Sequence, residues 1–167
     1  MLKIKSGFYF WVILSLICMA AIFVFSSQTS AESSKLSGSV TKKVIAVMDE
    51  GKDHTDKSII ETFGDIDTLG MAVRKTAHIF IYLILSICVT KAAGKITDSK
   101  LYIFLIALIT CSFFAATDEW HQYFIPGRSC RWQDWLIDTI GVLLGIGAVA
   151  AFTWANRIID RILKKSK

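Results

Sequence analysis

Ionisable and polar side chains recur at intervals of three or four residues within stretches of this sequence that are otherwise apolar. An α-helix turns once in 3.6 residues, so this spacing places the side chains of each stretch on one helical face. The candidate site residues on these faces are Arg74, His78 and Tyr82 in the first stretch, Asp118 and Gln122 in the second, and Asp134 and Asp138 in the third. Lys75 and Glu119 lie beside the first two faces, and Arg128 lies in the loop before the third stretch. Ionisable groups are costly in apolar helices, and their concentration here indicates a functional site.

One function that these residue types suit is the binding of an anionic headgroup. Arginine presents a planar fork of N–H donors that matches phosphate, so Arg74 and Arg128, together with Lys75, are candidates for holding a lipid-linked phosphate or pyrophosphate. Pro126 and Gly127 precede Arg128 and predict a tight turn that presents its side chain.

A second possibility is an enzyme that hydrolyses or transfers part of a lipid-linked precursor. His78 would then be the general acid or base. Its candidate partners are Asp118, Glu119 and Asp138. No recognised metal-binding spacing is present, so we expect neither a metal nor another cofactor. A nucleophilic pair of Cys130 and His121 is compatible with the residue types alone.

A third possibility is structural. An ion-paired cluster among Arg74, Arg128, Asp118, Glu119 and Asp138 would clamp three helices together, and function would lie in contact with another membrane protein. In that case removal of Asp138 should abolish folded protein rather than inactivate it.

The elements that position these residues are expected to be membrane-spanning helices. Hydrophobic residues make up 53% of the 167 residues, and a span needs about 20 mostly apolar residues. Four windows meet this length, at about residues 7–25, 71–93, 101–117 and 135–154. We therefore predict an all-α membrane protein with four transmembrane helices in a single domain, residues 1–167. In the last window Gly141 and Gly145 are suited to close helix packing.

Lysine and arginine gather in three of the segments outside these windows. They are Lys3 and Lys5 before the first window, Lys91, Lys95 and Lys100 between the second and third, and Arg157, Arg161, Lys164, Lys165 and Lys167 after the fourth. The positive-inside rule places these segments, and thus both termini, in the cytoplasm. The alternative for the first window is a cleaved signal peptide, whose apolar region is usually shorter. The net charge of +5 is then a topology signal and does not call for a nucleic-acid partner.

The long segment at residues 26–70 forms the outer loop in this topology. Leu36, Val40, Val44 and Val47 recur there at helical spacing, which predicts an amphipathic helix that lies on the outer leaflet or caps the bundle. Residues 49–67 have no hydrophobic periodicity, which is typical of a flexible lid or linker. Trp120, Trp132 and Trp135 fit an interfacial aromatic belt.

Several of these segments resemble the VanZ-like family. The matching segments are Phe25-Ser26-Ser27-Gln28, Arg74-Lys75-Thr76-Ala77-His78-Ile79-Phe80-Ile81-Tyr82, and Asp118-Glu119-Trp120-His121-Gln122-Tyr123-Phe124-Ile125-Pro126-Gly127-Arg128, followed by Asp134, Asp138 and Gly141. The one departure is Asp138, where many members carry asparagine.

The resemblance implies a multi-pass protein of the bacterial cytoplasmic membrane with a link to resistance against the glycopeptide teicoplanin. Its shared polar residues correspond to Arg74, Lys75, His78, Asp118, Glu119, Gln122, Arg128, Asp134 and Asp138. The expected partners are membrane lipids and a lipid-linked cell-wall precursor or a glycopeptide. The resemblance supplies no mechanism.

Overall fold

The computed structural model describes residues 5–49 and 66–165, and these residues form helices without any β-strand. The helices are α1 (Phe8–Ser26), α2 (Ser30–Asp49), α4 (Ile66–Ala93), α5 (Lys100–Tyr123) and α6 (Trp132–Lys165). Among them α1, α4, α5 and α6 are long and apolar enough to cross a bilayer. The prediction of an all-α protein with four transmembrane helices is confirmed.

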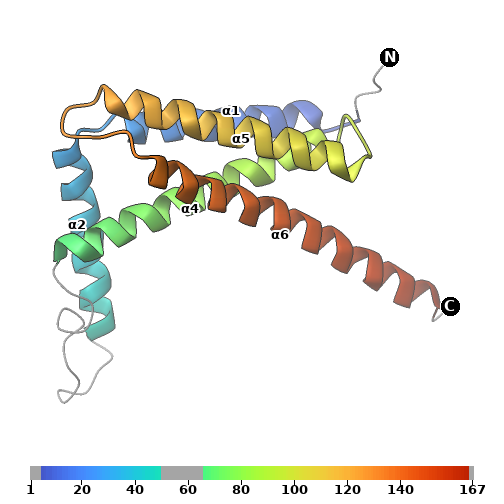
Figure 1. The fold of residues 1–167 in the computed structure, drawn as a ribbon. Coiled ribbons are helices and arrows are strands. Elements are labelled where there is room, and N and C mark those ends of the chain that lie inside the picture. Colours follow the sequence, from blue (N-terminus) through green and yellow to red (C-terminus); the bar gives the residue numbers. More distant parts are fainter. Residues whose placement is uncertain (1–4, 50–65, 166–167) are drawn as a thin grey trace.

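Helix α4 is the centre of the bundle, because it packs against each of the other four helices. The N-terminal end of α1, the α4–α5 connection and the C-terminus of α6 lie at one end of the bundle, while α2 and the α5–α6 connection lie at the other (Figure 1). Backbone contact across the first end is direct, since Lys5 N donates to Lys95 O at 3.0 Å. The bundle thus has two chemically distinct ends, one basic and one mixed in charge.

Helices α4 and α6 approach each other more closely than side chains would allow. A Cβ atom on Gly141 would lie 2.4 Å from the carbonyl oxygen of Ile79, and one on Gly145 would lie 2.4 Å from that of Leu83. The predicted role of these glycines in close packing is therefore confirmed. Backbone contact of this kind replaces the hydrophobic driving force that helices lack in lipid.

The helices extend beyond the apolar windows that revealed them. Helix α6 has 34 residues, about 50 Å at ~1.5 Å per residue, so it exceeds the ~30 Å hydrocarbon core. The predicted span ended at about residue 154, and the helix continues through the basic segment that follows to Lys165. Helix α5 likewise continues past residue 117 to Tyr123, which keeps Asp118 and Gln122 on helical geometry.

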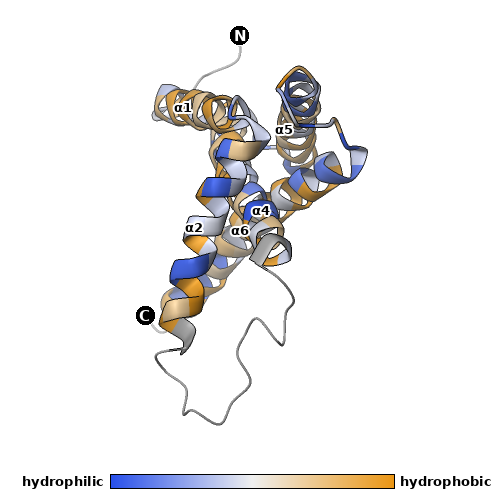
Figure 2. Cartoon of the chain, turned by 90° about the vertical axis from the view of Figure 1, so that its left-hand side faces the viewer, coloured by the Kyte–Doolittle hydropathy of each residue, from blue (hydrophilic) through white to orange (hydrophobic). Residues whose placement is uncertain are grey.

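Helix α2 lies across the end of the bundle and packs on α4 (Figure 1). Its buried side chains are small and polar, namely Ser33, Ser37 and Thr41. Its apolar residues are exposed, namely Leu36, Val40, Val44 and Val47. Orange and blue residues accordingly both lie on its surface in Figure 2. The helix thus caps the bundle with a polar face and leaves an apolar stripe suited to lipid contact. The predicted linker falls largely on residues 50–65, outside the described residues.

The start of α2 is fixed by a capping box. The backbone N–H and the hydroxyl of Thr29 donate to Glu32 Oε2 at 2.9 and 2.8 Å, and Glu32 N donates to Thr29 Oγ1 at 3.3 Å. These hydrogen bonds from Thr29 lower the pKa of the exposed Glu32 carboxyl. Two N–H groups that the helix cannot satisfy are paired in this way, which sets where α2 begins.

Candidate functional site

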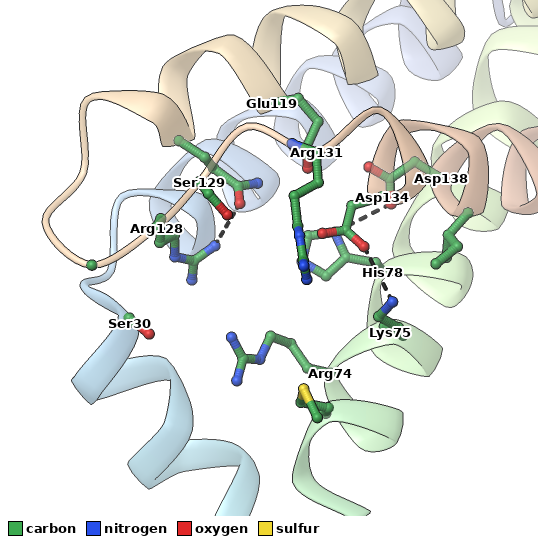
Figure 3. Close-up of a pocket in the computed structure, with 14 residues that line it drawn as sticks. Ser30, Arg74, Lys75, His78, Glu119, Arg128, Ser129, Arg131, Asp134 and Asp138 are labelled. Atoms are coloured by element: carbon green, nitrogen blue, oxygen red, sulfur yellow. Dashed lines mark hydrogen bonds and ion pairs between the residues drawn. The ribbon is translucent and has the colours of Figure 1, made fainter. Parts of the chain in front are cut away.

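A polar cavity of about 220 Å³ opens at the end of the bundle that carries α2. All elements except α1 contribute to its wall (Figure 3). The charged and titratable lining residues are Arg74, Lys75 and His78 from α4, Glu119 from α5, Arg128 and Arg131 from the α5–α6 loop, and Asp134 and Asp138 from α6. Because a water takes about 30 Å³, the cavity has room for a phosphate or pyrophosphate group.

Two close pairs link α4 to α6 along one wall of the cavity. Lys75 Nζ lies 3.3 Å from Asp134 Oδ1, and His78 Nδ1 lies 3.3 Å from Asp138 Oδ1 (Figure 3). The first pair is partly exposed, whereas the Asp138 side chain is only 1% exposed. Close packing at Gly141, one turn further along α6, holds the His78–Asp138 pair in this buried position.

Behind the cavity, α5 carries a buried hydrogen-bonded layer. Asp118 Oδ2 accepts from Ser26 Oγ at 2.7 Å and from Gln122 Nε2 at 3.0 Å. The other end of the Gln122 amide accepts from Arg128 Nη1 at 2.9 Å. This chain of contacts ties the end of α1 to the α5–α6 loop, so Arg128 is positioned by neutral and anionic groups behind it.

The α5–α6 loop is shaped by the predicted Pro-Gly turn. Gly127 has a φ of +76°, which L side chains rarely adopt, and a Cβ atom there would lie 3.1 Å from Ser30 Cβ. Pro126 O accepts from Ser30 N at 3.3 Å, so the loop is docked on the start of α2. Further along, Arg131 N donates to Glu119 Oε2 at 3.1 Å. The loop therefore presents its arginines from a fixed backbone.

Three guanidinium groups face the cavity without a carboxylate partner. Within the described residues, Arg74, Arg128 and Arg131 form no ion pair within 4.0 Å. Arg74 donates only to Ser34 Oγ, at 3.3 Å. Figure 3 shows all three side chains directed toward the same open space. Desolvation, followed by the positive charge of Arg74, lowers the pKa of Arg128, although an arginine remains protonated at physiological pH.

The predicted ion-paired cluster is wrong in its partners. Arg74 and Arg128 contact Ser34 and Gln122 rather than the carboxylates assigned to them. Those carboxylates contact other groups: Asp118 accepts from Ser26 and Gln122, Glu119 accepts from the Arg131 backbone, and Asp138 lies against His78. Within the described residues the two arginines therefore have neutral hydrogen-bond partners and no direct ion pair, which the sequence spacing could not indicate.

Eight of the ten candidate residues line the cavity, and two do not. Tyr82 is fully buried in the core between the helices, and Asp118 lies behind Gln122. Their positions correct the expectation that every residue on these helical faces reaches the ligand. Asp118 belongs to the hydrogen-bonded layer behind the lining, whereas Tyr82 belongs to the hydrophobic core.

A second, apolar cavity of about 290 Å³ adjoins the polar one. Its wall is formed by α1, α2 and α4 and includes Ile22, Leu36, Val40 and Ile81. It also contains Arg74, His78 and Arg128, which line the polar cavity too. The two cavities therefore share part of their walls, and these three side chains lie between them.

Comparison with known proteins gives one family for this chain. The sequence profile of the VanZ/LLP1 family matches residues 10–153, which include every residue of the site. The chain belongs to the VanZ/LLP1 family. No curated protein and no solved structure matches it significantly.

Sequence reasoning missed Arg131 and Ser26 of this VanZ/LLP1-family site, as well as the lining residues Ser30, Met71, Ser129 and Ile137. Arg131 lines the cavity, and the only available signal was its position three residues after Arg128. Ser26 donates to Asp118, and its signal was the Ser26-Ser27 pair in the first matching segment. In the sequence, both residues stand out only by their position in or near a motif, because neither has a spacing that indicates a chemical role.

The proposed Cys130–His121 pair finds no support in the site of this VanZ/LLP1-family protein. His121 Nε2 lies 3.2 Å from Ser27 Oγ and its ring stacks on Phe23, while Cys130 is exposed in the loop. Neither residue lines the cavity. Within the described part of the chain, no group of three histidine, cysteine or acidic side chains is placed to hold a metal ion. Trp135, one of the tryptophans of the predicted interfacial belt, donates its ring N–H to Ser112 O at 3.0 Å.

Proposed function

We propose that this protein binds an anionic cell-envelope lipid or lipid-linked precursor at the outer face of the bacterial cytoplasmic membrane. The observation that carries the proposal is the set of three guanidinium groups without carboxylate partners around one cavity. The phosphate or pyrophosphate of the ligand would lie between Arg74 and Arg128.

Electrostatic repulsion within the cavity supports an anionic ligand. Burial disfavours the protonated form of Arg128 most, and the positive charge of Arg74 adds to this cost, while Asp118 and Glu119 offset part of it. A phosphate between the two would offset both effects and accept several N–H groups at once, which gives charge-assisted hydrogen bonds their strength. Lys75 is paired with Asp134, so it would contribute mainly to the positive electrostatic potential of the cavity.

The adjoining apolar cavity supports a ligand with a hydrocarbon chain. Its boundary with the polar cavity lies at Arg74, His78 and Arg128. A headgroup held there would direct its chain between α1, α2 and α4, toward the exposed apolar stripe of α2. A free inorganic anion would use only the polar half of this arrangement.

The distribution of basic residues supports placing the site outside. Lys5, Lys91, Lys95, Lys100 and Arg157 belong to the opposite end of the bundle, which the positive-inside rule assigns to the cytoplasm. The exposed Cys130 gives a direct test in intact cells, because the other three cysteines lie within spanning helices. A membrane-impermeant maleimide should label the wild type without permeabilisation and leave Cys130→Ser unlabelled. Labelling only after permeabilisation would place the site inside.

Binding is tested with purified protein and a polyprenyl phosphate, with the neutral polyprenol as the reference ligand. We expect the phosphate to bind at least about tenfold more tightly, and Arg128→Gln and Arg74→Gln to abolish this preference. Arg128→Lys should also weaken binding, since lysine keeps the charge but loses the fork. Lys43→Gln is the control, because Lys43 is exposed on α2 away from both cavities. Unchanged binding by Arg128→Lys and Arg128→Gln would refute the proposal.

The link to glycopeptide resistance belongs to the same proposal and rests on the family alone. A protein that holds a lipid-linked cell-wall precursor would change how much of it teicoplanin can reach. Cells that produce the wild type should tolerate more teicoplanin than cells that produce Arg128→Lys at the same membrane level.

The His78–Asp138 pair favours hydrolysis or transfer as a second function. Asp138 lies against Nδ1 of His78, which leaves Nε2 as the ring nitrogen for a ligand in the cavity. A carboxylate that orients a histidine in this way is typical of general acid–base catalysis. If the second function holds, wild-type protein should release phosphate from a polyprenyl pyrophosphate, and His78→Gln should bind this lipid without releasing phosphate. No release by the wild type leaves binding as the function.

A further inference from the structure

A separate cavity of about 610 Å³ opens at the basic end of the bundle. It lies where the α4–α5 connection meets the first turn of α5 and the middle of α6. Five lining residues are cationic, namely Lys5, Lys91, Lys95, Lys100 and Arg157. None of them lines either of the cavities described above, so this basic cavity has its own chemistry.

The positive charge of this cavity is largely uncompensated. Asp98 is its one acidic lining residue, and it is paired with Lys5. Within the described residues, the other four cations form no ion pair within 4.0 Å. Lys91 Nζ lies 5.4 Å from the centroid of the Phe152 ring, a cation–π distance that keeps its ammonium group over α6. An anion in the cavity would meet several cations that α4, the α4–α5 connection, α5 and α6 bring together.

The remaining wall is apolar and belongs to the membrane-spanning part of the helices. Ile103 and Phe104 of α5 face Ile146 and Val149 of α6 across the cavity. Cationic side chains near the ends of spans and an apolar wall beside them match a phospholipid, whose phosphate and acyl chains are joined at that depth. A soluble anion would gain nothing from the apolar wall.

We propose that this cavity is a binding site for an anionic phospholipid of the adjacent leaflet, such as phosphatidylglycerol. The phosphate lies among Lys91, Lys95 and Arg157, and the acyl chains run along Ile146 and Val149. Such a lipid holds α6 to the α4–α5 connection at the point where α6 leaves the bundle. The site is independent of the function proposed for the polar cavity.

The site is tested by native mass spectrometry on the detergent-purified full chain. Dioctanoyl phosphatidylglycerol is the probe, and dioctanoyl phosphatidylcholine and inorganic phosphate are the comparison ligands. All measurements use an Arg74→Gln/Arg128→Gln background, so that the polar cavity does not contribute. In this background we expect phosphatidylglycerol to bind about tenfold or more tightly than either comparison ligand.

Within that background, Lys91→Gln/Arg157→Gln should abolish the preference. The matched control is Lys42→Gln/Lys43→Gln, which changes the net charge equally on exposed positions of α2. Lys91→Arg/Arg157→Lys keeps both charges and should retain the preference, which separates lost recognition from lost folding. Three results would overturn the proposal: an equal loss in the control, equal binding of phosphatidylcholine, or equal binding of inorganic phosphate.

Discussion

The contact of Gly141 with α4 sets both the stability of the bundle and the geometry of the polar cavity. A Cβ atom at this position would lie 2.4 Å from the backbone oxygen of Ile79. Ordinary contact begins at about 3.4 Å, so in Gly141→Ala the two helices must separate by about 1 Å. Backbone cannot rotate away as a side chain can, and the strain must be taken up by the packing of α4 on α6.

The magnitude follows from comparison with Gly147→Ala. Gly147 lies on the same helix, and a Cβ atom there would meet nothing within 4 Å. Both variants gain the same helix propensity, about 1 kcal/mol, so their difference isolates the overpacking cost of about 1–3 kcal/mol. At roughly 2–4 °C per kcal/mol, a cost of 2 kcal/mol lowers the unfolding midpoint by about 4–8 °C.

The assay is thermal unfolding in detergent, which is monitored through the reaction of the buried Cys88 and Cys111 with a fluorogenic maleimide. Both glycine variants carry Cys130→Ser, because the exposed thiol would react before unfolding. Separation by about 1 Å would also stretch the 3.3 Å His78–Asp138 contact beyond 4.0 Å, so anionic lipid binding should weaken in Gly141→Ala alone. Equal midpoints for the two glycine variants would refute the account of α4–α6 packing.

Three further outcomes test other parts of the structure. Thr29→Ala removes the capping box, so hydrogen exchange should accelerate in the first turn of α2. Because the pKa of Glu32 is lowered, the cap stabilises α2 above the ordinary glutamate pKa and this stabilisation is lost as the pH falls. The exchange rate of Thr29→Ala should not show that pH dependence. An unchanged exchange rate would contradict the cap. Trp135→Phe leaves Ser112 O without its 3.0 Å donor and should cost about 1 kcal/mol in detergent unfolding, whereas no cost would mean that Trp135 serves only as an interfacial residue. Lys75→Gln should change stability by less than about 1 kcal/mol, because the pair with Asp134 is partly exposed; a larger loss would indicate a structural clamp.

Much of the architecture was predictable from the sequence because the bilayer imposes it. Four apolar windows became four helices, and the stripe of Gly141 and Gly145 became the close contact with α4. Window length locates the hydrocarbon core but does not say where a helix stops. For this reason the continuation of α6 to Lys165 was not predicted.

The partners of the polar residues were harder to predict, because spacing gives the face of a helix and not its rotation within the bundle. Tyr82 shares a face with His78 in sequence, but it points into the core. On α2 the apolar stripe was evident, yet the helix packs with its serine and threonine face, as small residues permit close approach in a membrane. The rotation of each helix about its axis decides which of its polar side chains line the polar cavity.

A variant of Asp138 distinguishes the structural hypothesis for the charge cluster from a functional one. Asp138→Asn retains the shape and removes the charge beside His78. Folded protein in normal amounts that fails to bind or process lipid would favour a functional site. Loss of folded protein from the membrane would instead favour a clamp.

The most direct test of the central claim is a structure of the protein purified with its native lipids. The account predicts a phosphate or pyrophosphate group in the polar cavity, within hydrogen-bond distance of both Arg74 and Arg128, and a hydrocarbon chain leading into the apolar cavity between α1, α2 and α4. A polar cavity that holds only water, while ordered lipid occupies other surfaces of the same molecule, would contradict it.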